Sequence, residues 1–145
     1  MITIKAKKEF LRKYKSLKRE EKTIREEIAA LEISTMTASV GIGDGMPHSH
    51  EPKGLEEYAA KKDALVRKLQ KVLWDCINQQ ILIEISINSL ESATERTIVR
   101  QRYLLFKDWD TIADFVGYSR RQTLYIHGAA LGHLEIAKRS FDEDN

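Results

Sequence analysis

Apolar residues recur along the first part of the chain at the spacing of an amphipathic helix. Between residues 7 and 33 the steps between them are 4, 3, 7, 4 and 3, at Phe10, Tyr14, Leu17, Ile24, Ile28 and Leu31. Steps of three and four are typical of a coiled-coil seam. The pattern predicts one helix of about 27 residues, hence about 40 Å long.

A second seam of the same kind follows a polar segment. It runs from residue 55 to about residue 90 and begins with Leu55, Tyr58, Leu65, Leu69, Val72 and Cys76. The segment between the seams, Ser34 to Gly54, holds both prolines and four of the seven glycines, which predicts a flexible connection. We therefore expect residues 1–90 to form an antiparallel coiled-coil hairpin with a loop at 34–54.

The second helix is predicted to extend beyond the first. Its final part is apolar on nearly every face, at Ile77, Ile81, Leu82, Ile83, Ile85, Ile87 and Leu90. A helix that is apolar all round is buried. We expect the C-terminal domain, the first residues of the chain and a second protomer to cover it, with Ile83 in the interface of a homo-oligomer.

The last third of the chain contains three signals for the start of a helix. Ser and Asp side chains accept hydrogen bonds from the first free N–H groups of a helix, and Glu or Gln three residues later completes a capping box. These signals stand at Ser92 with Glu95, at Asp108, and at Ser119 with Gln122. They predict three helices after residue 91, the last running from Arg120 towards Arg139.

The last two of these helices have the layout of a helix-turn-helix. A short helix, Trp109 to Val116, stops at Gly117, which can adopt the positive φ that the turn needs. Ala113 is small where the two helices must approach closely, and we expect Trp109 in the core. The predicted fold is all-α: a coiled-coil hairpin at 1–90, a three-helix helix-turn-helix domain at 91–140, and an acidic tail at 141–145.

The start of the last helix carries the chemistry of DNA recognition. Arg and Gln side chains donate hydrogen bonds to bases and phosphates, a leucine can touch a thymine methyl, and a tyrosine can bind phosphate. His127 is expected to be structural or to contact phosphate, and Gly128 and Gly132 to pack closely against another helix. The predicted DNA-contacting set is Ser119, Arg120, Arg121, Gln122, Leu124, Tyr125 and His127.

Composition and charge fit this interpretation. The 145 residues are 42% hydrophobic and 32% charged with a net charge of +2, which is typical of a folded helical protein. The stretch 94–139 carries eight basic and five acidic residues. With one cysteine and no run of 18 apolar residues, the chain predicts a cytoplasmic protein with no disulfide and no membrane span.

No enzyme, cofactor or metal motif stands out. There is no phosphate-binding glycine loop after a strand, and Cys76 lacks a catalytic partner. His48 and His50 form an H-x-H pair, but no third ligand follows at the spacing of a zinc motif. We expect no catalytic residues, no metal and no cofactor.

The C-terminal third resembles known DNA-binding families. The stretch from Glu95 to Leu104 is similar to the first half of region four of bacterial sigma factors, and the stretch from Trp109 to Arg120 is similar to its helix-turn-helix. With His127-Gly128 added, the motif string resembles small phage and prophage proteins of the RinA/ArpU type, which are late-gene transcription regulators. The resemblance covers about the last third of the chain.

The resemblance implies a function, although three residues of the last helix depart from the sigma pattern. Arg120 matches the sigma pattern and is expected to contact DNA, whereas Arg121, Leu124 and Tyr125 depart from it, so a different target sequence is expected. The implied protein is a phage-type activator of late genes that binds duplex DNA, with RNA polymerase and a second copy of itself as further expected partners. The rival interpretations are a small terminase subunit that serves DNA packaging and an adaptor that binds protein only.

Overall fold

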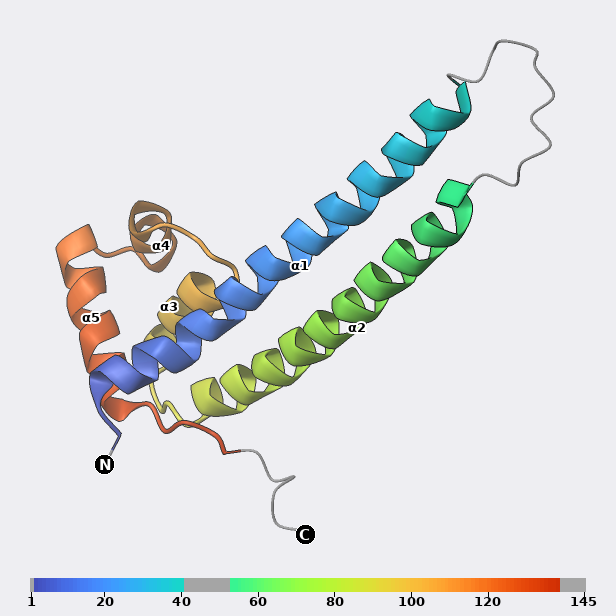
Figure 1. Cartoon of the computed structure of the whole chain (residues 1–145). Helices are drawn as coiled ribbons and strands as arrows, with labels where there is room; N and C mark the ends of the chain where they lie inside the picture. The colour runs from blue at the N-terminus through green and yellow to red at the C-terminus, as the bar shows by residue number, and fades with distance from the viewer. Residues whose placement is uncertain (1, 41–52, 139–145) are drawn as a thin grey trace, which may run out of the picture. The chain divides into compact units, whose positions relative to one another are not determined.

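The computed structural model describes residues 2–40 and 53–138, and these are helical with no strand among them. The helices are α1 (Ile4–Val40), α2 (Lys53–Asn88), α3 (Ala93–Tyr103), α4 (Trp109–Val116) and α5 (Arg120–His133) (Figure 1). The prediction of an all-α chain is confirmed for this part of the molecule. The acidic tail at 141–145 and most of the predicted loop lie outside the described residues.

Both long helices continue into the segment that we predicted to be a loop. The prediction was wrong for residues 34–40 and 53–54, which are helical. Residues 34–40 contain serines and threonines but no glycine or proline, so nothing forces the helix to stop there. The Thr35 hydroxyl donates to the Leu31 carbonyl oxygen at 3.0 Å, a bond that a threonine can make inside a helix.

Residue contacts divide the chain into two units, and one of them is Lys18–Trp74. Within it, the second half of α1 and the first half of α2 lie side by side and run in opposite directions (Figure 1). Ile24 and Val72 are buried, and the Lys62 ammonium group pairs with Glu32 at 3.2 Å. Leu55, the first residue of the predicted second seam, is exposed.

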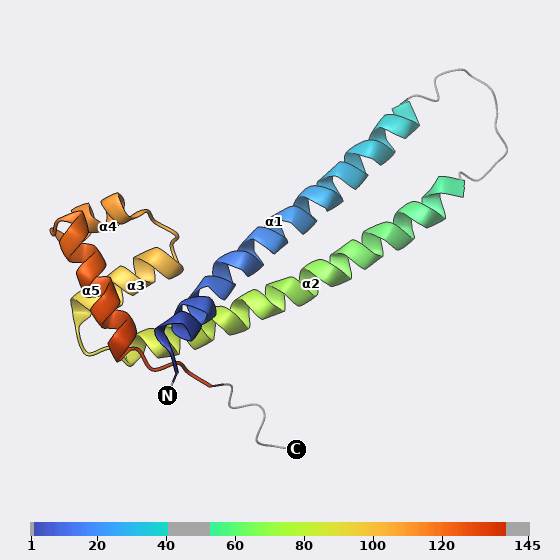
Figure 2. The same cartoon turned by 60° about the vertical axis from the view of Figure 1, so that its left-hand side comes forward.

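The other unit joins the two ends of the chain, Met1–Leu17 and Asp75–Asn145. In it α3, α4 and α5 all contact one another, close to the first turns of α1 and the last turns of α2 (Figure 2). Its core comes from every one of these helices and consists mainly of Leu11, Ile83, Ile87, Leu90, Ile98, Val99, Ile112, Leu131 and Leu134. The Gln79 side-chain amide donates to the Phe10 carbonyl oxygen at 2.8 Å.

The apolar end of α2 is covered on one side only. Ile83 and Ile87 are fully buried within the chain, so the expectation that Ile83 lies between protomers was wrong. The remaining face stays open, because Ile77, Ile81 and Ile85 are each 51–53% exposed.

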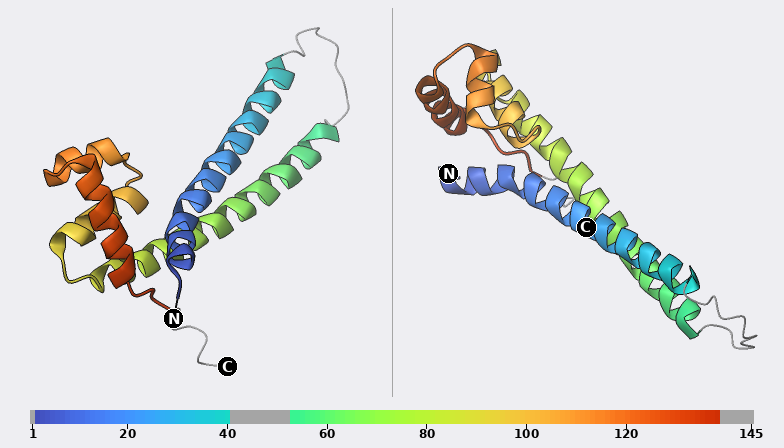
Figure 3. Two further views of the ribbon diagram at one scale, coloured as in Figure 1. Left: turned by 90° about the vertical axis from the view of Figure 1, so that its left-hand side faces the viewer. Right: turned by 90° about the horizontal axis from the view of Figure 1, so that it is seen from above.

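The chain leaves α5 at His133, six residues before the predicted end. Residues 134–138 are extended and bond to the end of α2, beside which they run in Figure 3. The Glu135 N–H donates to Ser89 Oγ at 3.0 Å, and the Ala137 N–H donates to Ser86 Oγ at 2.9 Å. These side-chain bonds replace the helical bonds that the backbone would otherwise make.

None of the described helices has an apolar stretch long enough to cross a bilayer.

Candidate nucleic-acid interface

Each helix of the C-terminal group begins at the capping residue that the sequence indicates. Ser92 Oγ accepts from the Glu95 N–H at 3.3 Å, Asp108 Oδ1 from the Thr111 N–H at 2.8 Å, and Ser119 Oγ from the Gln122 N–H at 3.1 Å. These bonds satisfy N–H groups that have no partner within their helix. The predicted N-caps are confirmed.

The turn between α4 and α5 is short and is set by one glycine. Gly117 ends α4 with φ +79°, and its N–H donates to the Ala113 carbonyl oxygen at 2.9 Å. A side chain at this φ would be strained, which explains the glycine. Ala113 is buried, and α4 and α5 pack against each other. Three residues, 117–119, therefore reverse the chain into α5.

Helix α5 has one buried side and one open side. Thr123, Ala130 and Leu131 are buried. On the other side Arg121 and Gln122 are exposed, Leu124 is 39% exposed and Tyr125 is 74% exposed. The predicted contact residues other than His127 thus lie at the start or on the open side of one helix, where they form a polar surface with two larger side chains.

The two arginines at the start of α5 differ in their surroundings. The Arg120 guanidinium lies 3.6 Å from the Asp110 carboxylate on α4, and both side chains are largely exposed. Within the described residues, Arg121 has no ion-pair partner. An incoming phosphate would have to compete with Asp110 for Arg120 but would meet Arg121 free.

His127 belongs to the interior and not to the open side of α5. Its ring is 7% exposed, and its Nε2 lies 2.7 Å from the Tyr103 hydroxyl on α3. Burial, together with the charges of Lys8, Arg102 and Arg12, lowers the pKa of His127 to about 4. Burial also raises the pKa of Tyr103, so both groups are neutral at pH 7. The geometry gives His127 a structural role and removes it from the contact set.

Trp109 forms the outer wall of this interior cluster. The Trp109 ring meets the His127 ring edge-on, with 4.7 Å between the two ring centroids. The Arg102 guanidinium lies over the Trp109 ring, 4.7 Å from its centroid. Trp109 is half-buried, and its contact with the buried His127 ring joins the start of α4 to the core, as we expected. Arg102 also donates to the Lys107 carbonyl oxygen at 3.0 Å, which holds the guanidinium on the indole.

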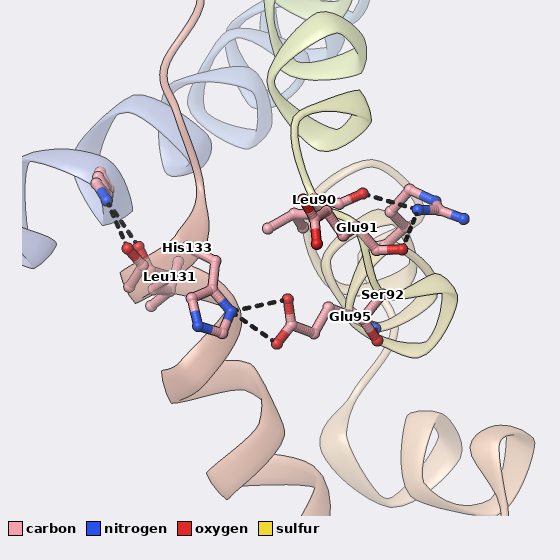
Figure 4. Close-up of polar contacts among 9 residues, drawn as sticks. Leu90, Glu91, Ser92, Glu95, Leu131 and His133 are labelled. Carbon is pink, nitrogen blue, oxygen red and sulfur yellow. Dashed lines mark hydrogen bonds and ion pairs between the residues drawn. The ribbon is translucent and has the colours of Figure 1, made fainter.

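A buried carboxylate joins α3 to the end of α5. Glu95 is 8% exposed, and its two oxygens lie 3.0 and 3.2 Å from His133 Nδ1 (Figure 4). The carboxylate points away from its own helix start, so only the Ser92 half of the predicted capping box forms. On the other side of α5, the Lys7 ammonium group donates to the Leu131 carbonyl oxygen at 2.9 Å. Two bonds from opposite sides thus hold the last turn of α5.

The two glycines of α5 lie on its open side. A Cβ added to Gly128 or Gly132 would meet no atom within 4 Å. The expectation that they pack against a neighbouring helix was therefore wrong. They leave part of the open side of α5 without side chains, so a partner could approach the helix backbone closely there.

The described residues contain no group of three His, Cys, Asp or Glu side chains placed to hold a metal ion. The H-x-H pair, His48 and His50, lies outside the described residues. Protein-family models, curated proteins and solved structures were compared with the chain, and none of them matches.

Proposed function

We propose that the protein binds duplex DNA, with α5 in the major groove, and regulates transcription from the bound site. The observation that carries this proposal is the arrangement of α4, the three-residue turn and α5. It leaves the Arg121, Leu124 and Tyr125 side of α5 open while the opposite side is buried. A capped helix presented in this way after a short helix and a glycine turn is how helix-turn-helix proteins present base-reading side chains.

Rigid support of α5 favours recognition of a defined sequence. Helix α5 packs against α3 and α4, with Thr123, Ala130 and Leu131 buried, and Lys7 and Glu95 bond to its last turn. Side chains on a helix held in this way keep their positions relative to base edges, as discrimination between bases requires. Arg121 is the side chain best placed to donate to a guanine or a phosphate.

The resemblance to sigma region four and to RinA/ArpU-type regulators adds the biological setting to this proposal. In this setting the protein is a phage or prophage regulator, an activator of late genes, and RNA polymerase is a further partner. The helix pair formed by residues 18–40 and 53–74 then serves as the coiled-coil part of the molecule.

We also propose that the open face of α2 binds the same face of a second copy. From Cys76 to Leu90 the only charged residue is Glu84, and it is paired with Arg100. Ile77, Ile81 and Ile85 repeat every four residues, so two such faces present the same apolar rows to each other. Self-association also suits the packaging alternative. A dimer or tetramer favours the regulator, whereas a closed ring of eight or more favours a small terminase subunit.

The experiment that tests DNA recognition is selection of bound duplexes from a random-sequence pool at about 0.15 M salt. Enrichment of one motif by the wild type, with loss of that enrichment in Arg121→Ala, supports the proposal. A matched control is Arg67→Ala, which removes an exposed arginine of α2. Recovery of DNA with no motif favours packaging, and no recovery contradicts DNA binding and leaves a protein partner as the main function.

The expected size of the Arg121→Ala effect is a loss of about 1–3 kcal/mol in binding to the selected duplex. Arg120→Ala should cost less, because it also removes the Asp110 pair that competes with DNA. Fluorescence anisotropy with a labelled duplex measures both. Equal affinities of wild type and Arg121→Ala would contradict the placement of α5 in the groove.

A further inference from the structure

The first turns of α1 form the most basic segment of the described chain. Up to Leu17 the helix carries six Lys or Arg residues and one acid, Glu9. Three of the cations, Lys8, Arg12 and Lys15, stand at positions i, i+4 and i+7, so they share one side of the helix. We call this side the basic face of α1.

The basic face borders the helices that carry the proposed DNA-reading surface. Two contacts fix α1 there: the Lys7 ammonium group bonds to the Leu131 carbonyl oxygen of α5, and the Tyr14 ring stacks on Phe106 at 5.6 Å. The Lys15 ammonium group lies 5.8 Å from the centroid of the same Phe106 ring. Lys8 and Arg12 lie between these two anchors along the helix.

The cations of this face have no acidic partners. Among residues 2–40 and 53–138, no carboxylate lies within 4 Å of Lys8, Arg12 or Lys15. Farther along α1, two of the next four cations, Lys18 and Arg25, pair with Glu21. Arg102 of α3 adds a further cation beside the face, and its charge acts on His127 together with those of Lys8 and Arg12.

We infer that the basic face of α1 binds backbone phosphates of the same duplex that α5 reads. This inference rests on the proposed function. Arg12 and Lys15 are exposed and Lys8 is half-buried. Cations of this kind, without acidic partners among the described residues, supply the sequence-independent part of DNA affinity by displacing counterions. From Lys8 to Lys15 the helix rises about 10 Å, which corresponds to about three phosphates of one strand.

The test compares two triple variants that remove the same charge. Lys8→Gln/Arg12→Gln/Lys15→Gln neutralises the basic face. The control, Lys13→Gln/Lys68→Gln/Lys71→Gln, neutralises three exposed lysines elsewhere on α1 and α2. For each variant the dissociation constant for the selected duplex is measured by anisotropy at several salt concentrations, and circular dichroism verifies that helix content and melting are unchanged.

We expect the basic-face variant to differ from the control in the salt dependence of binding and in affinity, but not in the selected motif. Each lost phosphate contact reduces the slope of log affinity against log salt by about 0.9, so the basic-face variant should lose about 2–3 from the slope. Its affinity at about 0.15 M salt should fall at least tenfold relative to the control variant. The selected motif should stay the same, because phosphate contacts carry no sequence information.

Each other outcome identifies what has failed. Equal slopes in the two triple variants would overturn the inference, because the loss would then be a general effect of net charge. If Arg121→Ala weakens binding but the basic-face variant does not, the proposed function stands and the inference falls. If the wild type binds no duplex, both fall, and capture of an acidic protein by the same face becomes the alternative.

Discussion

The buried histidine should make the folding of its unit sensitive to mild acid. His127 has a pKa of about 4 in the folded protein, below its ordinary value of 6.5, because burial and three nearby cations disfavour the imidazolium. The unfolded chain binds the proton more readily, so protonation favours unfolding. The stability contributed by neutral His127 is complete above about pH 6.5 and is lost as the pH falls towards 4.

The size of this effect follows from the two pKa values. With 6.5 for the unfolded state and about 4 for the folded state, the full loss is about 3 kcal/mol, of which about 2 kcal/mol falls between pH 7.5 and pH 5. Glu21 and Asp108 have lowered pKa values as well, but their contributions are lost only at lower pH. Measurements down to pH 5 therefore isolate the histidine.

The assay is urea unfolding at several pH values between 7.5 and 5, followed by the fluorescence of Trp109. A Trp74→Phe background removes the other tryptophan, which is exposed and belongs to the other unit. In this background His127→Gln should lose most of the dependence on pH, since glutamine stays neutral. It can still bond to the Tyr103 hydroxyl.

The control is His133→Gln, which removes a largely exposed histidine from the same helix. This variant keeps the buried His127, so it should lose as much stability in acid as the parent. An acid-induced loss in His127→Gln as large as in the parent would refute the reasoning, because the burial of a neutral imidazole could then not be its cause.

Four further substitutions test other features. Gly128→Ala should raise the free energy of unfolding by about 0.5–1 kcal/mol in urea, since the new methyl meets no atom, yet weaken duplex binding; unchanged binding would mean that this side of α5 does not face DNA. Ile81→Glu should lower the mass seen by light scattering without loss of the melting transition, whereas Ile83→Ala should cost about 2–5 kcal/mol of stability; a wild-type mass for Ile81→Glu would place the self-association surface elsewhere. Asp108→Ala should lower the urea midpoint by removing the cap of α4, and an unchanged midpoint would argue against that bond.

Local signals in the sequence were sufficient to predict the helix starts. A capping side chain bonds to a backbone N–H only three residues away, so Ser92, Asp108 and Ser119 could be recognised without knowledge of the fold. The positive φ at Gly117 is local in the same sense, because only glycine adopts it without strain.

Long-range bonds explain most of what the sequence did not predict. Glu95 is satisfied by His133, 38 residues away, and the last part of the predicted α5 is drawn out by Ser86 and Ser89 of α2. Nothing in the local pattern specifies such partners. Which apolar residues of α2 become buried also depends on distant parts of the chain. Ile83 and Ile85 look alike in sequence, but only Ile83 meets the helices that fold back onto α2.

The burial of His127 could have been anticipated from one signal. It stands four residues after Thr123 and four before Leu131, on the side of α5 that is buried, whereas Leu124 and Tyr125 stand on the other. Helical periodicity alone separates the two groups. We did not recognise the buried side because positions 123 and 127 hold a threonine and a histidine, which are not apolar residues.

The union of the two chain ends in one unit has a consequence for the order of events during synthesis. Residues 1–17 leave the ribosome well before residue 131, but the Lys7 bond to Leu131 spans 124 residues, so this segment must wait until residue 131 has emerged. Closing so long a loop costs more entropy than local pairing does. Residues 18–74 can pair with each other during that wait, which shortens the loop that remains to be closed. The unit that contains residues 1–17 is thus completed after the pairing of residues 18–74, and a chain that stalls before residue 131 leaves the first turns of α1 without their partners on α5.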